Sequence, residues 1–161
     1  MAINNQGLSR FNAALHELGR TLGIPDLAAD ENGTCALKYG DQEVIVQRDQ
    51  DCNHATVFTV LGELPENVSR RCLQSLLTAN LFWDKTEGST LSIDPDSNGL
   101  VLARLLDLPR LEPEEGPERI SEFVETAYAW KEIYPDLLSN EEGGAAQPPA
   151  AFAGVDIRNF G

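Results

Sequence analysis

The strongest pattern of the chain is a helix followed by a two-strand hairpin, and it spans residues 65–106. Apolar side chains recur there at three- and four-residue spacing, so they share one face of a helix. Pro65 suits the first helical turn, where its missing N–H is not needed, and the helix is expected to end near Asn80. A helix with so many apolar positions can cover a sheet and still leave apolar surface for another chain. Its stripe comprises Val68, Cys72, Leu73, Leu76, Leu77 and Leu81.

The hairpin comes directly after this helix. Gly88 interrupts the helical pattern, and Leu91 and Ile93 then alternate with polar residues, as on a half-buried strand. Turn-forming residues at 94–99 end this strand, and a second apolar strand follows at 100–106.

The first sixty residues predict a helix and three strands. The helix covers residues 4–22 and is expected to end at Gly23, which can adopt the left-handed conformation. The strands are expected at 34–39, 43–48 and 56–61. Their connections are short, so an antiparallel meander is the simplest pairing. The apolar stripe of the helix consists of Leu8, Phe11, Leu15, Leu18 and Leu22.

A last helix is predicted over residues 117–134, limited by Pro135. The order of elements is therefore α-β-β-β-α-β-β-α. With antiparallel strands and helices packed on one side of them, the chain falls in the α+β class. The stripe of the last helix consists of Ile120, Phe123, Ala127, Trp130 and Tyr134.

The composition changes after residue 139, which predicts a domain at 1–139 and a linker with a tail at 140–161. The linker is rich in glycine, alanine and proline, as in flexible connections. We expect the tail to be disordered in isolation. The alternative is a short peptide that docks on its own domain or on a neighbouring chain. The apolar residues of the tail are Phe152, Val155, Ile157 and Phe160.

Charge narrows the choice of partners. Twelve basic side chains face 26 acidic ones, for a formal charge of −14. Such a surface repels phosphate, which disfavours nucleic acid and anionic membranes as partners. The excess of acidic residues either serves solubility alone, or it helps to keep a basic or aggregation-prone partner soluble in a complex. The chain shows no secretory signal and no apolar run long enough to span a bilayer, so we expect a cytosolic protein.

Candidate chemistry is sparse. The three cysteines form no CxxC pair. Cys52 and His54 could supply two metal ligands, but a zinc site requires three or four ligands from the protein. The turn at 94–99 matches the first six positions of a calcium-binding EF-hand loop, but the twelfth position is Leu105 instead of glutamate. We predict no catalytic residue, no metal and no cofactor.

Three segments, in order, resemble the CesT/SycE-like family of type III secretion chaperones. They are Leu-Gly-Ile-Pro-Asp-Leu at 22–27, Leu-Leu-Thr-Ala-Asn-Leu-Phe at 76–82, and the hairpin residues 86–94 with 99–102. The resemblance covers roughly residues 5 to 134. The linker and tail depart from it, since a compact member of the family would stop near Asn140.

The resemblance implies a function and a quaternary structure. Members bind the N-terminal region of a secreted effector in the bacterial cytosol, hold it extended and non-globular, and aid its delivery to the secretion apparatus without enzymatic activity or ATP. They are homodimers, with the central helix and the hairpin at the interface. Carried onto this chain, the expected interface residues are Leu73, Leu76, Leu77, Asn80, Leu81 and Phe82.

The expected client site lies in the part of the chain outside that interface. A disordered client loses entropy on binding and therefore needs a large buried surface. Exposed strand edges can accept an extended segment, and apolar grooves can hold its alternate side chains. The expected effector-binding residues are Leu15, Leu18, Leu22, Val44, Val46 and Phe58, with core packing as the competing role for each.

Two further interpretations remain. One is an adaptor of the same fold that serves several clients, controls the order of export or contacts the secretion ATPase. The other is an enzyme of unrecognised type that uses Cys52, His54 and nearby acids, for which Cys52→Ala and His54→Ala would abolish function.

Overall fold

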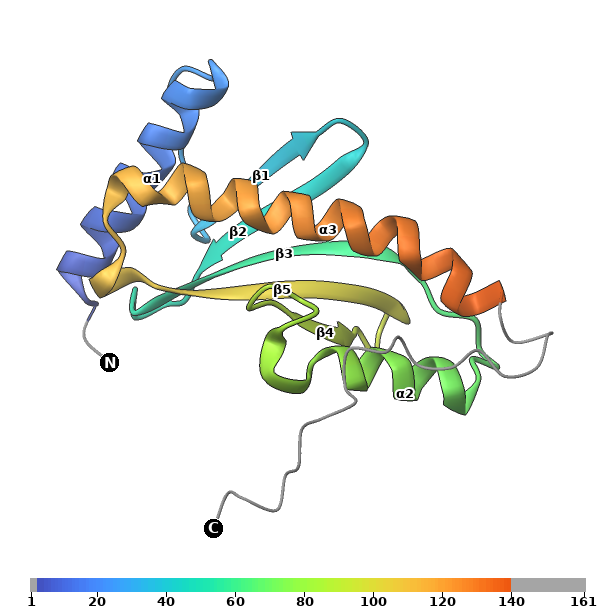
Figure 1. Ribbon diagram of the computed structural model, residues 1–161. Coiled ribbons are helices and arrows are strands. Elements are labelled where there is room, and N and C mark those ends of the chain that lie inside the picture. The colour runs from blue at the N-terminus through green and yellow to red at the C-terminus, as the bar shows by residue number, and fades with distance from the viewer. Residues whose placement is uncertain (1–2, 140–161) are drawn as a thin grey trace, which may run out of the picture.

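The computed structural model describes residues 3–139, which contain three α-helices and one five-stranded antiparallel sheet (Figure 1). The predicted order of elements is confirmed. The linker and tail at 140–161 lie outside the described residues. The helices are α1 (Asn5–Leu22), α2 (Arg70–Ala79) and α3 (Gly116–Ser139). The strands are β1 (Thr34–Tyr39), β2 (Gln42–Arg48), β3 (His54–Glu63), β4 (Thr90–Ile93) and β5 (Gly99–Asp107).

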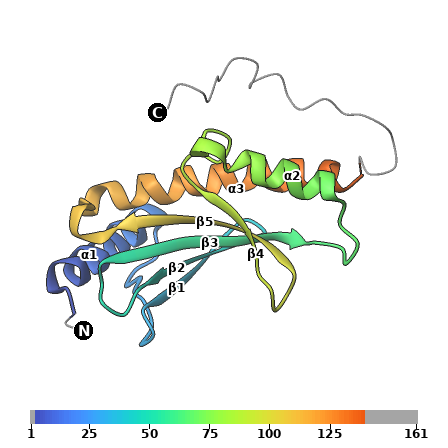
Figure 2. The ribbon, with the colours of Figure 1, turned by 90° about the horizontal axis from the view of Figure 1, so that it is seen from below.

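The strand order across the sheet is β1-β2-β3-β5-β4, and every neighbouring pair is antiparallel. The first three strands form the predicted meander, and β5 inserts between β3 and β4. Consequently β1 and β4 are the two edge strands. All three helices lie on one side of the sheet (Figure 2).

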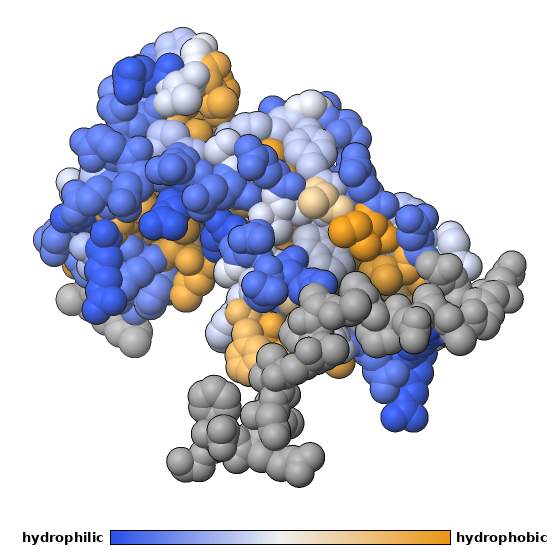
Figure 3. Space-filling view, in the orientation of Figure 1, coloured by the Kyte–Doolittle hydropathy of each residue, from blue (hydrophilic) through white to orange (hydrophobic). Residues whose placement is uncertain are grey.

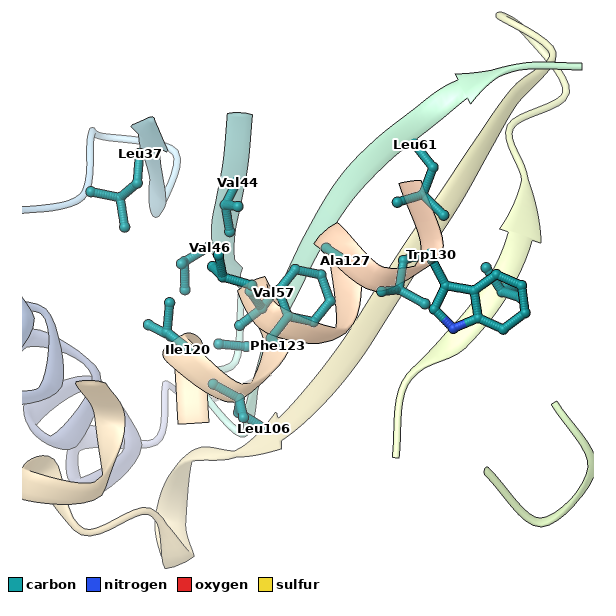
Figure 4. Close-up of a cluster of buried hydrophobic side chains, with 14 of the residues drawn as sticks. Leu37, Val44, Val46, Val57, Leu61, Leu106, Ile120, Phe123, Ala127 and Trp130 are labelled. Atoms are coloured by element: carbon teal, nitrogen blue, oxygen red, sulfur yellow. The ribbon is translucent and has the colours of Figure 1, made fainter. Parts of the chain in front are cut away.

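The core fills the space between the helices and the sheet (Figure 4). Phe123 of α3 is fully buried and lies against Val46 and Val57 of the sheet. Trp130 extends this packing along α3, and its indole N–H donates to the Lys85 carbonyl, 3.1 Å away. Each of the five stripe residues predicted for the last helix is buried, so α3 covers the sheet as its pattern requires.

Local signals set the ends of α1. The Asn4 side chain accepts from the Gly7 N–H, which satisfies one of the unpaired donors of the first turn. Gly23 takes the left-handed conformation at φ 69°, as predicted, and its N–H donates to the Gly19 carbonyl.

Two predicted helix ends were wrong. The central helix begins after Ser69 and not at Pro65, because the Ser69 hydroxyl accepts from the Cys72 N–H and caps the helix there. The last helix continues through Pro135 to Ser139. Tyr134 packs on Gly62 and its hydroxyl donates to the Glu63 carbonyl, which holds this end of α3 on the sheet despite the lost N–H.

Candidate partner-binding surfaces

One candidate surface, which we call the α2–η1 patch, lies at the end of α2 and the 3₁₀ turn Leu81–Trp83. Its five apolar side chains are 43–69% exposed, and Leu77 is the most exposed of them. Apolar colour marks the surface in this region, at the bottom of the view in Figure 3. A contiguous cluster of large apolar side chains on an otherwise polar surface is typical of a protein interface. The patch consists of Leu77, Leu81, Phe82, Trp83 and Ile93.

The backbone of the α2–η1 patch is strained. Phe82 and Trp83 have φ of 58° and 56°, a region that bulky side chains rarely adopt. Such residues cost about 1–3 kcal/mol each, and they concentrate at functional sites. Both aromatic rings are also exposed, Phe82 at 57% and Trp83 at 55%, as expected for residues that contact another molecule.

Two hydrogen bonds from Asn80 anchor the patch to the sheet. The Asn80 side chain accepts from the Leu91 N–H (2.8 Å) and donates to the Leu91 carbonyl (2.9 Å). The indole of Trp83 donates to the Thr90 hydroxyl, 3.2 Å away. These contacts hold the 3₁₀ turn Leu81–Trp83, η1, against the edge strand β4.

The structure divides the six residues expected at a dimer interface. Leu76 belongs to the core, at 4% exposure, and Leu73 is half-buried. Leu77, Leu81 and Phe82 belong to the α2–η1 patch, whereas the amide of Asn80 is occupied by Leu91. Their part in a dimer stays a prediction.

Trp83 and Ile93 were not among the residues expected at this surface. Trp83 directly follows two residues that were selected, so the run Leu-Phe-Trp was a signal for it. Ile93 was assigned to the buried side of its strand by alternation with Ser92. It does share the helix side with Leu100, but at 43% exposure, because it sits at the end of the edge strand.

A second candidate surface, the open sheet face, lies on the side of the sheet that carries no helix. Residues paired across antiparallel strands share a face, so the register defines this surface. Ile45, Phe58 and Ala103 form one apolar row across three strands, and Val60 pairs with Val101 in the next. Val60 is 50% and Leu105 64% exposed. We define the open sheet face as Ile45, Phe58, Val60, Val101, Ala103 and Leu105.

The effector-binding candidates fall in three places. Four of them are core residues at 0–2% exposure. Leu22 is 39% exposed at the end of α1, and Phe58 is half-buried on the open sheet face. Their contact with an effector stays a prediction, and Leu22 and Phe58 are the two with accessible side chains. The four core residues are Leu15, Leu18, Val44 and Val46.

The two sheet edges differ in their capacity to accept an added strand. At β4 the outward groups of Leu91 are taken by Asn80. At β1 the outward N–H and C=O of Thr34 are taken by the side chain and the backbone of Asp30. Outward groups alternate along a strand, so the next residues of β1 that present theirs to solvent are Ala36 and Lys38, both exposed. The β1 edge is therefore the more open of the two.

Cys52 and His54 lie in different surroundings. The Cys52 side chain is fully buried and its sulfur lies 3.5 Å from Nη1 of Arg48. His54 is exposed, with its Nδ1 3.3 Å from the Asp49 carboxylate. Among residues 3–139, no three His, Cys, Asp or Glu side chains are grouped to hold a metal ion.

A buried arginine joins β5 to both neighbouring segments. The guanidinium of Arg104 donates to the Ser89 hydroxyl and the Glu87 carbonyl on one side, and to the Arg119 carbonyl and the Glu122 carboxylate on the other. Burial lowers the pKa of Arg104, and Glu122 opposes that shift. With four acceptors on its donors, this side chain is a structural link.

The chain belongs to the Tir chaperone protein (CesT) family, whose model matches residues 13–131. No curated protein sequence matches it. Within residues 3–139, no helix has both the length and the apolar character needed to cross a membrane.

Solved structures share the fold. The chaperone–effector complex HopA1–SchA contains a chain that is 18% identical, with a TM-score of 0.65, over 81% of this chain and 98% of that one. The Yersinia pestis type III secretion chaperone SycH, solved with a fragment of YscM2, is 18% identical with a TM-score of 0.59, over 74% of this chain and 98% of that one. A chain of the ExoT–SpcS complex from Pseudomonas aeruginosa is 22% identical with a TM-score of 0.55, over 74% of this chain and 96% of that one.

Proposed function

We propose that this protein is a type III secretion chaperone that works as a homodimer in the bacterial cytosol. It binds the N-terminal segment of a secreted effector, keeps that segment non-globular and soluble, and aids its delivery to the secretion apparatus. The observation that carries this function is family membership over residues 13–131, joined to two exposed apolar surfaces on one small domain. The proposed role is one of binding without catalysis.

The α2–η1 patch is the proposed dimer surface. Two-fold dimers use the same patch on both subunits, so one self-complementary apolar surface is sufficient. Phe82 and Trp83 supply large aromatic contacts of the kind that dominate interface energetics. Leu77 and Leu81 extend the contact along the helix, and Ile93 closes it at the edge strand.

The open sheet face and the β1 edge are the proposed effector site. Ala36 and Lys38 can pair with an extended client segment through their backbones. Phe58 and Val60 on β3 and Leu105 on β5 lie two and three strands away from β1. The client chain beyond the paired segment therefore crosses the open sheet face and contacts these three residues, and their burial offsets the entropy that the client loses on ordering. Both surfaces face away from the α2–η1 patch, so one subunit can bind an effector and its own partner together.

Charge supports this assignment. A formal charge of −14 disfavours acidic clients and keeps a complex with an apolar client in solution. An adaptor for several clients, or one that contacts the secretion ATPase, shares every surface described above. The number of effectors bound is what separates it from a chaperone with a single client.

Co-purification from the native host tests the proposal. The full chain is captured, the bound proteins are identified, and the mass of the complex is measured. Two chaperone chains with one effector fragment is the expected composition. The matched variants are Leu105→Asp on the open sheet face and Ile133→Asp on α3, both exposed apolar positions. Loss of effector with Leu105→Asp alone supports the site; equal retention by both variants contradicts it.

A further inference from the structure

We propose that residues 150–161 of the tail dock on the open sheet face of their own subunit and cover it when no effector is bound. This inference rests on the proposed function, because it assigns an intramolecular competitor to the surface proposed there for effectors. The segment and the surface are complementary in three respects: the composition of the segment, its charge and its reach.

The composition of the tail segment suits a sheet surface. Val155 and Ile157 alternate with Asp156 and Arg158, so an extended conformation places its branched apolar side chains on one side and its charges on the other. In the same conformation Phe152 and Phe160 share the side of the charges, so Val155 and Ile157 are the side chains that would meet the sheet. An apolar face that meets such a segment buries side chains of the type already common in sheet cores.

Charge favours the same contact. The segment has one acidic side chain, Asp156, and one basic side chain, Arg158, so its side chains carry no net charge, whereas the chain has a formal charge of −14. It therefore approaches the acidic domain without the repulsion that an acidic segment would meet. The other two acids of residues 140–161, Glu141 and Glu142, stand in the linker before it.

The end of α3 brings the tail close to the open sheet face. Tyr134 packs against Gly62 of β3, and Val60 lies two residues before Gly62, about 7 Å along the strand. Packed layers are about 10 Å apart, so the distance that the linker must cover from the helix layer to the other side of the sheet is of this order. Residues 140–149 span up to about 33 Å when extended, so the linker can round the end of the sheet.

The tail also lies outside the part of the chain that matches the family, because the family model ends at residue 131. The alignment with the HopA1–SchA chain takes up 98% of that chain and 81% of this one.

A spin label on the tail tests where it docks. Ala151→Cys is introduced into the full chain and labelled, since the natural Cys35, Cys52 and Cys72 are buried. The methyl signals of Val60 and Leu105 are expected to lose intensity, whereas those of Leu77 on the α2–η1 patch keep it. No loss, or a loss confined to Leu77, overturns the proposal. The proposal is also overturned if spin-labelled chains, mixed with chains that carry no spin label, cause an equal loss at Val60 of the latter. The tail of another subunit would then occupy the face.

Two tail variants separate a specific contact from mere proximity. Val155→Ser with Ile157→Ser is expected to restore the methyl intensities, and Gln147→Ser in the linker is the matched control that leaves them reduced. Nile red, a neutral apolar dye, measures the freed surface. If the tail covers the face in about nine of ten molecules, its removal raises the apparent affinity for the dye about tenfold. An unchanged affinity overturns the proposal.

Failure of this inference is distinguishable from failure of the proposed function. Neither tail experiment contains an effector. If Leu105→Asp abolishes effector binding but the spin label on the tail leaves the Val60 signal unaffected, the tail contact alone is rejected. A tail that docks in a chain that captures no effector rejects the proposed function alone.

Discussion

The side-chain amide of Asn80 pairs with both backbone groups of Leu91, at 2.8 Å to its N–H and 2.9 Å from its carbonyl. The carboxamide thereby takes the place of a neighbouring strand at the outer edge of β4. An edge strand with unpaired groups invites strand addition by other chains. Asn80 closes this edge and, at the same time, fastens the end of α2 to the sheet beside the α2–η1 patch.

The first prediction concerns this contact. Asn80→Ala is expected to lower the free energy of unfolding by about 2 kcal/mol, because two hydrogen bonds of about 1 kcal/mol each are lost. Urea unfolding measures the change, and hydrogen exchange at the Leu91 amide is expected to accelerate. Thr78→Ala, at an exposed position of the same helix, is the control and should be near-neutral. A shift equal to that of the control would contradict the prediction.

The second prediction concerns the oligomeric state. Leu77→Asp is expected to convert the dimer into a folded monomer, because it places a charge at the most exposed apolar position of the α2–η1 patch. Light scattering gives the mass, and circular dichroism confirms the fold. Ile133→Asp makes the same change at an exposed helix position outside the patch and should leave the dimer intact.

Monomeric wild-type protein at micromolar concentration would reject the dimer surface outright. A dimer retained by Leu77→Asp but lost with Leu105→Asp would place the interface on the open sheet face instead. The two substitutions therefore decide between the two exposed apolar surfaces of the domain.

The third prediction concerns the buried arginine. Arg104→Lys is expected to lower the free energy of unfolding by about 1–3 kcal/mol, because a lysine ammonium cannot reach acceptors on both sides of β5 at once. Arg119→Lys is the matched control. Arg119 is half-exposed and lies 3.9 Å from the shared partner Glu122, so its replacement should cost about 0.5 kcal/mol or less. Equal shifts for the two variants would show that Arg104 has no special role.

The order of the elements could be predicted from the sequence because the apolar residues recur with clear helix and strand periodicities. The stripe of α3 and the left-handed Gly23 are local features, and the structure has both where the sequence placed them. The two wrong helix ends depended on competing signals. At the start of α2, the side-chain cap of Ser69 favours helix initiation more than Pro65 does. At the end of α3, the packing of Tyr134 stabilises the helix by more than Pro135 destabilises it.

The candidate surfaces were harder to predict because they depend on what lies nearby in space. Leu15, Leu18, Val44 and Val46 are apolar at the right spacing for either a core or a groove, and only the covering helices assign them to the core. In contrast, nothing in the sequence near Leu105 indicates that its side of the strand is left without a helix.

The last prediction concerns acid pH. The Lys131 ammonium donates to the Asp41 carboxylate at 2.8 Å, across the contact between α3 and the β1–β2 turn. This hydrogen bond, with the attraction of the charge, lowers the pKa of Asp41. Lys131→Met is expected to raise that pKa toward its ordinary value of about 4. An NMR titration of the side-chain carboxyl carbon measures it.

The sign of the effect on stability follows from the direction of this shift. Because the pKa of Asp41 is lower in the folded chain, the ion pair contributes stability above the unfolded pKa of about 4 and loses it as pH falls through the folded value. The difference in urea midpoint between wild type and Lys131→Met should therefore shrink below about pH 4. Lys38→Met is the control, since Lys38 acts on Asp41 through charge alone and its removal should move the pKa less. A midpoint difference that stays constant in acid would show that Lys131 stabilises the fold by packing and not through Asp41.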